Sequence, residues 1–177
     1  MVPSTMEVIQ MAGDMFLKLD GIKGESIDDA KPAHKDEIDI IGWSFGVSNP
    51  ASFALGQGGQ QSKPTFSDFH ISKYVDKASA ALMNAAATGK HFKDGKITCR
   101  KAAGESKLEY LIIKLDEVLI TSVQHSGSGS EQYVHESVTL TCGAIDFTYQ
   151  GQADITGGAE GNFEFTYDLQ KQTSNLK

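Results

Sequence analysis

The sequence predicts a mainly β protein: an antiparallel β-barrel of two sheets with one flanking α-helix, at about residues 79–89, and a long extended loop. Most apolar segments alternate with a period of two residues, which is the spacing of a half-buried strand. A single alanine-rich segment has the composition of a helix. With 177 residues, the chain is long enough for one domain with a sizeable core.

The alternation begins at residues 14–20 and is clearest at residues 41–47. In the second segment the predicted buried face carries Ile41, Trp43, Phe45 and Val47, and the opposite face carries Gly42, Ser44 and Gly46. A strand of this kind combines one large apolar face with one smooth face. Further strands are predicted at residues 66–73, 96–101, 108–124, 131–150 and 163–169, with a bend or bulge at Asp116–Glu117 in the strand at residues 108–124.

The predicted helix begins at Ser79, or one turn earlier at Asp76, because both residue types are good helix N-caps. Its apolar side chains that could face a core are Leu82, Met83, Ala85 and Ala86. Gly89 suits the left-handed position that ends a helix. The Gly89–Lys90 pair therefore marks a helix end and not a phosphate-binding loop, because the residues which that motif requires around the pair are missing.

Composition and spacing argue against several classes of function. A net charge of -7 and a pI of about 5.1 disfavour a nucleic-acid partner, and the apolar runs are too short for membrane insertion. No Cys/His spacing suits a metal, no catalytic constellation is evident, and we expect no cofactor and no enzyme. Cys99 and Cys142 could form a disulfide, although two buried thiols are the preferred interpretation. Lys73 and Lys77, beside the helix start, are expected in salt bridges or a subunit contact.

Several segments, in order along the chain, resemble one protein family. They include DMFLK at residues 14–18, HKDEIDIIGWSFGVS at 34–48, FHISKYVDKAS at 69–79, LEYLIIKLDEVLITS at 108–122 and ESVTL at 136–140. These motifs are similar to those of Hcp, the haemolysin-coregulated protein of bacterial type VI secretion systems. The resemblance runs from about Met11 to the end. It implies a single Hcp-like β-barrel domain at residues 11–177, preceded by a flexible extension at residues 1–10 or by an alternative upstream start.

The resemblance also implies a function. Hcp-like proteins form homo-hexameric rings that stack into an inner tube, which a contractile sheath propels from the cell together with a tip protein and secreted effectors. Some effectors are held in the lumen. The protein would then reside in the bacterial cytoplasm before firing and be secreted without a cleavable signal peptide. The competing interpretation is a monomeric, lipocalin-like small-ligand-binding barrel with an apolar cavity.

On this basis we predict two functional surfaces. Gly42, Ser44 and Gly46 would face the lumen and its effectors, while Trp43 and Phe45 anchor the barrel core; the alternative is that this face meets solvent or another subunit. The loop at residues 48–63 would make the contact between rings through Phe53, Leu55 and Gln57. The alternative there is a disordered loop without a role.

Overall fold

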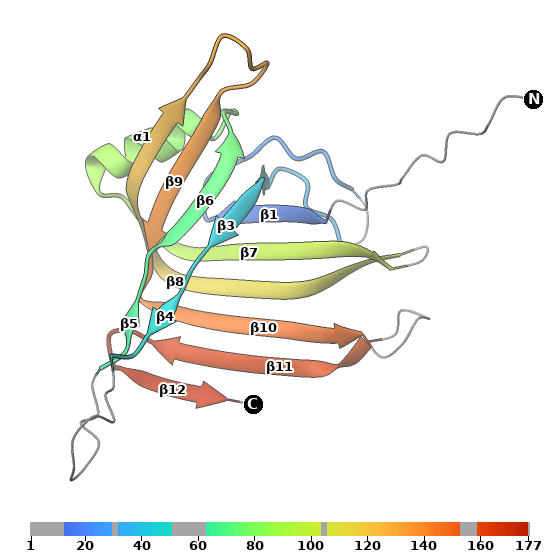
Figure 1. The fold of residues 1–177 in the computed structure, drawn as a ribbon, viewed down its shortest axis with the longest axis vertical. Coiled ribbons are helices and arrows are strands. Elements are labelled where there is room, and N and C mark those ends of the chain that lie inside the picture. Colours follow the sequence, from blue (N-terminus) through green and yellow to red (C-terminus); the bar gives the residue numbers. More distant parts are fainter. Residues whose placement is uncertain (1–12, 30–31, 51–62, 104–105, 153–158, 177) are drawn as a thin grey trace, which may run out of the picture.

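The computed structural model describes residues 13–29, 32–50, 63–103, 106–152 and 159–176 (Figure 1). The predicted extension at residues 1–10 and the loop residues Phe53, Leu55 and Gln57 lie outside these ranges. The described elements are β1 (Asp14–Leu19), β2 (Ile38–Asp39), β3 (Gly42–Ser44), β4 (Val47–Ser48), β5 (Thr65–Phe66), β6 (Phe69–Tyr74), α1 (Ser79–Thr88), β7 (His91–Ala103), β8 (Ser106–Ser126), β9 (His135–Thr141), β10 (Ala144–Gln152), β11 (Ala159–Asp168) and β12 (Thr173–Leu176).

The strands form a barrel-like wall with a lateral extension, and this confirms the predicted mainly β, antiparallel fold. Antiparallel ladders join β1 to β7, β7 to β8, β8 to β9, β9 to β6 and β6 to β3. The wall closes because β2 and β3 are two halves of one bent strand. The Ile40 amide donates to the Met15 carbonyl of β1 at 3.0 Å, and the next amide, Ile41, donates to Ser72 of β6 at 2.7 Å.

The long strand β8 belongs to both the wall and the extension. Its first half pairs with β10, which continues through β11 to β12, and its second half pairs with β9 (Figure 1). The change of partner occurs beside Glu117, whose φ of 54° is a left-handed conformation. The predicted bend at Asp116–Glu117 is therefore confirmed.

The single strand predicted at residues 131–150 is wrong, because the chain breaks between β9 and β10 to follow the bend of β8. At the break, the Gly143 amide donates to the Asp116 carbonyl at 2.8 Å. A Cβ atom at Gly143 would lie 3.2 Å from the Cβ of Glu117, so the close approach of the two bends favours glycine.

The strands predicted at residues 41–47 and 66–73 are also interrupted, and at matching positions. The Ser67 amide donates to the Gly46 carbonyl, and the Gly46 amide donates to the Ser67 hydroxyl, both at 2.9 Å. The two chains bend together there, and β4 and β5 continue as a separate two-stranded sheet. Ile41 and Val47 consequently lie at the surface, with exposed fractions of 44% and 56%, and the prediction that both are buried is wrong.

The helix packs against β8 and ends as predicted at Gly89, which adopts a φ of 65°. Leu82 and Ala85 are buried against the core, but Met83 is half exposed. The helix starts at Ser79 as predicted, but Ser79 is its first helical residue, and the N-cap position is occupied by Ala78. The core fills the interior of the barrel with fully buried side chains, among them Leu17, Leu19, Ile71, Ile97, Ile113, Leu115, Val138 and Leu140.

Candidate functional site

Four strands of the barrel carry one continuous outer face of small polar residues. Cross-strand pairs extend it from β3 through β6 and β9 to β8. Its members are Gly42, Ser44, His70, Ser72, Ser122, Gln124, Ser137 and Thr139, and we call it the small polar face. Two of the three residues predicted to face the lumen, Gly42 and Ser44, lie on it, and the third, Gly46, follows Ser44 in the chain beyond β3.

The small polar face is open and carries little charge. A Cβ atom at Gly42 would meet no heavy atom within 4 Å, and one at Gly46 would meet the Ser67 hydroxyl at 3.9 Å. Its one titratable member, His70, lies 3.2 Å from the Thr139 hydroxyl through Nδ1. The eight positions of this face offer hydrogen-bonding groups but no carboxylate or ammonium, and the Asp68 carboxylate lies at its margin beside Thr121.

Trp43 and Phe45 lie on the opposite, inner side and are partly buried against the core. The Trp43 indole Nε1 donates to the Cys99 sulfur at 3.2 Å, and the Phe45 ring stacks on Phe69 with a centroid distance of 4.1 Å. Cys99 and Cys142 are free thiols. Burial raises the pKa of Cys99, despite the bond from Trp43, and raises that of Cys142 to about 12. Both thiols are therefore poor nucleophiles near neutral pH.

A buried ion pair lies below the start of the helix. The Lys73 ammonium is 2.6 Å from Glu136 and 2.9 Å from Asp76, and the Lys73 and Glu136 side chains are both 0% exposed. The Ser79 hydroxyl donates to the same Glu136 oxygen at 2.8 Å, and His125 Nε2 lies 3.1 Å from the other. The cluster ties α1 to β6 and β9, and it confirms a salt bridge for Lys73.

The role of Glu136 was not predicted from the sequence, although a signal exists. Lys73 shares its strand face with the buried Ile71, and Glu136 shares its face with Val138. A charge placed on a buried face needs a partner on a neighbouring strand. The two residues pair directly across β6 and β9, so the ladder register brings them together.

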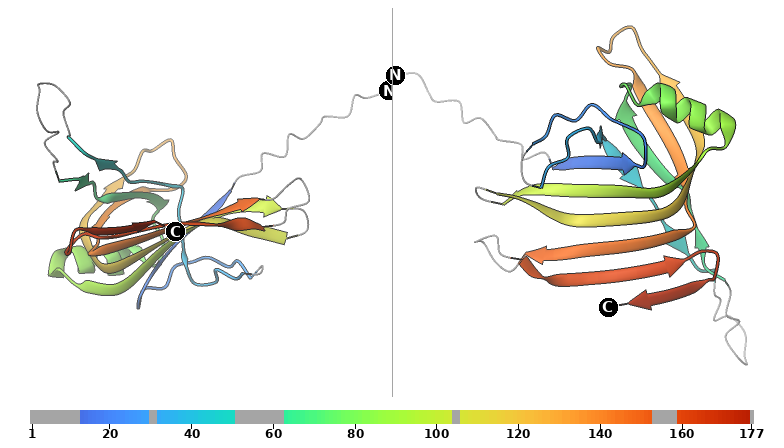
Figure 2. Two further views of the ribbon diagram at one scale, coloured as in Figure 1. Left: turned by 90° about the horizontal axis from the view of Figure 1, so that it is seen from below. Right: turned by 180° about the vertical axis from the view of Figure 1, so that it is seen from behind.

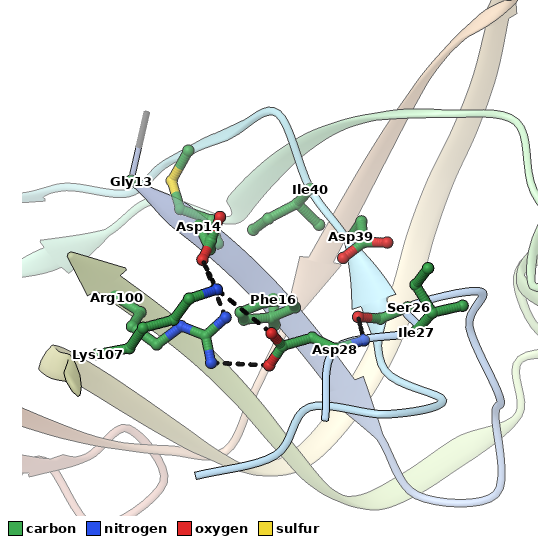
Figure 3. A pocket seen from close by; sticks show the side chains of 11 residues that line it. Gly13, Asp14, Phe16, Ser26, Ile27, Asp28, Asp39, Ile40, Arg100 and Lys107 are labelled. Carbon is green, nitrogen blue, oxygen red and sulfur yellow. Dashed lines mark hydrogen bonds and ion pairs between the residues drawn. The ribbon is translucent and has the colours of Figure 1, made fainter. Parts of the chain in front are cut away.

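A pocket of about 380 Å³ lies where β1 and β7 meet the segment that follows β1 (Figure 3). Its lining residues are Gly13, Asp14, Met15, Phe16, Ser26, Ile27, Asp28, Asp39, Ile40, Arg100 and Lys107. We call it the β1 pocket. No motif in the sequence marked it, because its residues come from five separate segments.

An ion cluster forms one wall of the β1 pocket. The buried guanidinium of Arg100 donates to Asp28 at 2.7 Å and to Asp14 at 2.9 Å, and it lies 5.0 Å from the centre of the Phe16 ring. Lys107 donates to Asp14 at 3.1 Å and to Asp28 at 3.4 Å. Two cations thus balance two carboxylates.

The cluster shifts the acidities of both carboxyl groups. The hydrogen bond from Arg100 lowers the pKa of Asp28 to about 2, against an opposing effect of burial. Burial acts to raise the pKa of Asp14, but the hydrogen bonds from Arg100 and Lys107 outweigh it and leave that pKa below its ordinary value. Burial raises the pKa of Asp39, which lines the pocket nearby.

Asp28→Asn should therefore reduce stability at neutral pH and matter less in acid. A carboxyl group whose pKa is depressed on folding stabilises the native state above its unfolded pKa, and this contribution is lost as pH falls through the folded pKa of about 2. In thermal melts, the difference between wild type and variant should be constant above about pH 5 and shrink toward zero near pH 2. Asp29→Asn, at an exposed neighbouring position, is the matched control. A difference that does not depend on pH would contradict the assignment.

The described residues offer no site of metal chemistry, since no group of three or more His, Cys, Asp or Glu side chains in them is placed to hold an ion. Among the same residues, no helix is long and apolar enough to cross a membrane. The two surface features that the described residues do form are the small polar face and the β1 pocket.

Comparisons with known proteins agree on one family. The family model described as type VI secretion system effector, Hcp, matches residues 16–149. The chain is 45% identical over 142 residues to protein hcp1 of Pseudomonas aeruginosa. The aligned region covers 80% of this chain and 86% of that protein. Among solved structures, a type six secretion system protein aligns with a TM-score of 0.85 and 29% identity, over 93% of this chain and all of the other. Hcp1 from Salmonella typhimurium aligns with a TM-score of 0.73 and 30% identity over the same shares.

Proposed function

The chain belongs to the Hcp family of type VI secretion system effectors, and on this premise we propose that six copies form a ring and that the rings stack into the inner tube of the secretion machine. In this role the protein is a structural component and performs no catalysis. Its partners are the sheath around the tube, the tip protein at its end and the effectors in its lumen. It waits in the bacterial cytoplasm and leaves with the tube when the sheath contracts.

The observation that best supports a tube wall is the small polar face. A lumen has to admit effectors of different sequence and release them after delivery, and this requires a surface without strong fixed charges or large apolar side chains. The small polar face satisfies both conditions across four strands. We therefore propose that it lines the lumen, with Trp43 and Phe45 behind it as core anchors and Gly46 at its margin.

The second proposed surface is the loop at residues 48–63. Closed rings need a further pair of unlike surfaces to stack head to tail. Phe53 and Leu55 are apolar anchors that gain stability when a partner covers them, and Gln57 is a polar, adaptable contact. We propose that these three residues contact the next ring.

The small-ligand barrel is not favoured as a function. Such a protein needs an empty apolar interior to hold its ligand. In this structure the corresponding space is filled by the core, in which Ile97, Ile113 and Leu140 are fully buried. The comparisons likewise lead to secretion proteins.

The lumen assignment predicts where a label on the small polar face will lie. Ser44→Cys and Ser137→Cys are exposed positions on two different strands of this face. After reaction with maleimide-gold, electron micrographs of the rings should show gold at the central channel for both variants. The wild-type protein should bind no gold, because Cys99 is buried and the pKa of Cys142 is about 12.

Ser130→Cys, in the connection between β8 and β9, is the matched control for gold that adheres to the channel without regard to position. Its gold should not gather at the centre. Gold at the outer rim of the rings for Ser44→Cys and Ser137→Cys would contradict the lumen assignment while leaving the ring itself intact.

A further inference from the structure

The described residues that flank the segment 51–62 lie at one end of the sheet, and the β1 pocket lies at the other. The described chain leaves the fold at Pro50 and returns at Lys63, beside β4 and β5 (Figure 1). The Phe66 ring of β5 packs on Tyr167 of β11. Successive cross-strand pairs connect Tyr167 to Leu115 of β8 and then to Gly95 of β7, so β5 lies near the first half of β7. The pocket lies near the other end of β7, at Arg100, where β1 begins (Figures 1 and 2).

We propose that the β1 pocket receives residues 51–62 from a second copy of this chain, so that each ring inserts its loops into pockets of the next ring. This inference rests on the proposed stacking of rings and names the surface that the loop meets. A loop at one end of the strands and a receiving pocket at the other form a head-to-tail contact, which repeats without limit along a tube.

The composition of the loop segment suits this pocket. Residues 51–62 read ASFALGQGGQQS and contain two large apolar side chains, three glutamines and no charged residue. Twelve residues that leave and re-enter at one place can form an arm about 20 Å long, because each residue spans about 3.3 Å at full extension. Such an arm can reach a neighbouring molecule while both of its ends stay in β4 and β5.

The pocket presents apolar surface where the arm would bring its anchors. The Ile27 side chain at its edge is 91% exposed, although it is a large aliphatic group, and Met15, Phe16 and Ile40 also line the space. Phe53 or Leu55 of a neighbouring copy would remove this surface from water.

The polar groups of the pocket call for an uncharged occupant. Arg100 and Lys107 are already balanced by Asp14 and Asp28, so an added charge would be left without a counterion. An uncharged glutamine amide can donate a hydrogen bond to the Asp39 carboxylate, which lines the same pocket.

A cross-linking experiment tests the pairing directly. In the double variant Ile27→Cys/Phe53→Cys, mild oxidation of concentrated protein should join the two introduced thiols of molecules in successive rings. Each chain then links to one above and one below, so non-reducing gel electrophoresis should show a ladder that continues beyond six chains. The single variants should give no such ladder, and neither should Met83→Cys/Phe53→Cys, which places the first thiol at a half-exposed position on α1.

The other outcomes overturn the proposal in distinguishable ways. A ladder that stops at six chains would mean that the loop contacts a neighbour within its own ring. Rings that stay hexameric in native mass spectrometry but give no ladder would show that the loop docks elsewhere, with the proposed function still standing. A double variant and wild type that are both monomeric would refute the ring itself.

A second variant tests the pocket without a cross-link. Ile27→Asp puts a charge on an exposed residue at the edge of the pocket, so the fold and the ring should persist. Tubes seen by electron microscopy should become at least about tenfold shorter, because an unpaired charge at the pocket weakens all the contacts between two rings. Val134→Asp also replaces an exposed aliphatic side chain by a carboxylate, but in the connection between β8 and β9, and it should leave tube length unchanged. Normal tubes for Ile27→Asp would overturn the proposal.

Discussion

Replacing Lys73 by methionine is expected to lower the free energy of unfolding by about 3–5 kcal/mol, because it leaves the Glu136 carboxylate buried without a cation. The Ser79 hydroxyl and the His125 ring would remain as hydrogen-bond partners, but neither replaces a lysine at 2.6 Å. The Asp76 carboxylate loses the same ammonium, so the turn that leads into α1 is weakened as well.

The double variant Lys73→Met/Glu136→Leu is the control for this prediction. It removes both charges and keeps apolar bulk between β6 and β9, so it should recover much of the loss. Urea denaturation at one fixed protein concentration is the appropriate measurement, because the stability of an oligomer depends on concentration. A double variant no more stable than Lys73→Met would contradict the explanation by an unpaired buried charge.

Trp43→Ala is expected to cost about 3 kcal/mol, at the low end for a large aromatic residue, because the indole is only partly buried. The change opens a cavity behind the small polar face and removes the donor to the Cys99 sulfur. Trp43→Phe keeps much of the apolar volume and should cost less than half as much.

Denaturation curves for the two variants separate packing from hydrogen bonding. If Trp43→Phe proves as unstable as Trp43→Ala, the bond to Cys99, and not the burial of the ring, holds this part of the barrel. A loss under about 1 kcal/mol for Trp43→Ala would show that Trp43 is not a core anchor.

Local patterns predicted most strands, the helix and the bend at Asp116–Glu117, but they did not predict that the strands at residues 41–47, 66–73 and 131–150 are divided. The strands predicted at residues 14–20 and 163–169 and the end of the helix at Gly89 are each determined by residues that are close together in the sequence. The breaks at Gly46 and Gly143 depend on contacts with Ser67 and Asp116, which are distant in the chain. Through Gly46 the alternation continues unchanged from Trp43 to Val47, so the sequence alone offers no reason to place that break. At Gly143 the buried apolar positions change from Val138 and Leu140 to Ile145, and this shift in phase is a signal that the prediction of a single strand overlooked.

The same distinction explains the candidate surfaces. Gly42 and Ser44 could be recognised from one strand, because small residues opposite Trp43 mark a smooth face. Their extension through His70, Ser72 and the residues of β9 and β8 requires the register of three ladders. The β1 pocket is further from prediction, since Asp14 and Arg100 meet only after β1 has paired with β7.

The central claim is that this chain is the repeating unit of a ring. Native mass spectrometry of the purified, full-length protein tests it most directly, because the number of copies in each particle is read from its mass. The expected particle contains six chains, and on raising the protein concentration it should be joined by multiples of six as rings stack. A protein that remains a monomer at every concentration, or that assembles into a particle with a different number of chains, would contradict the account.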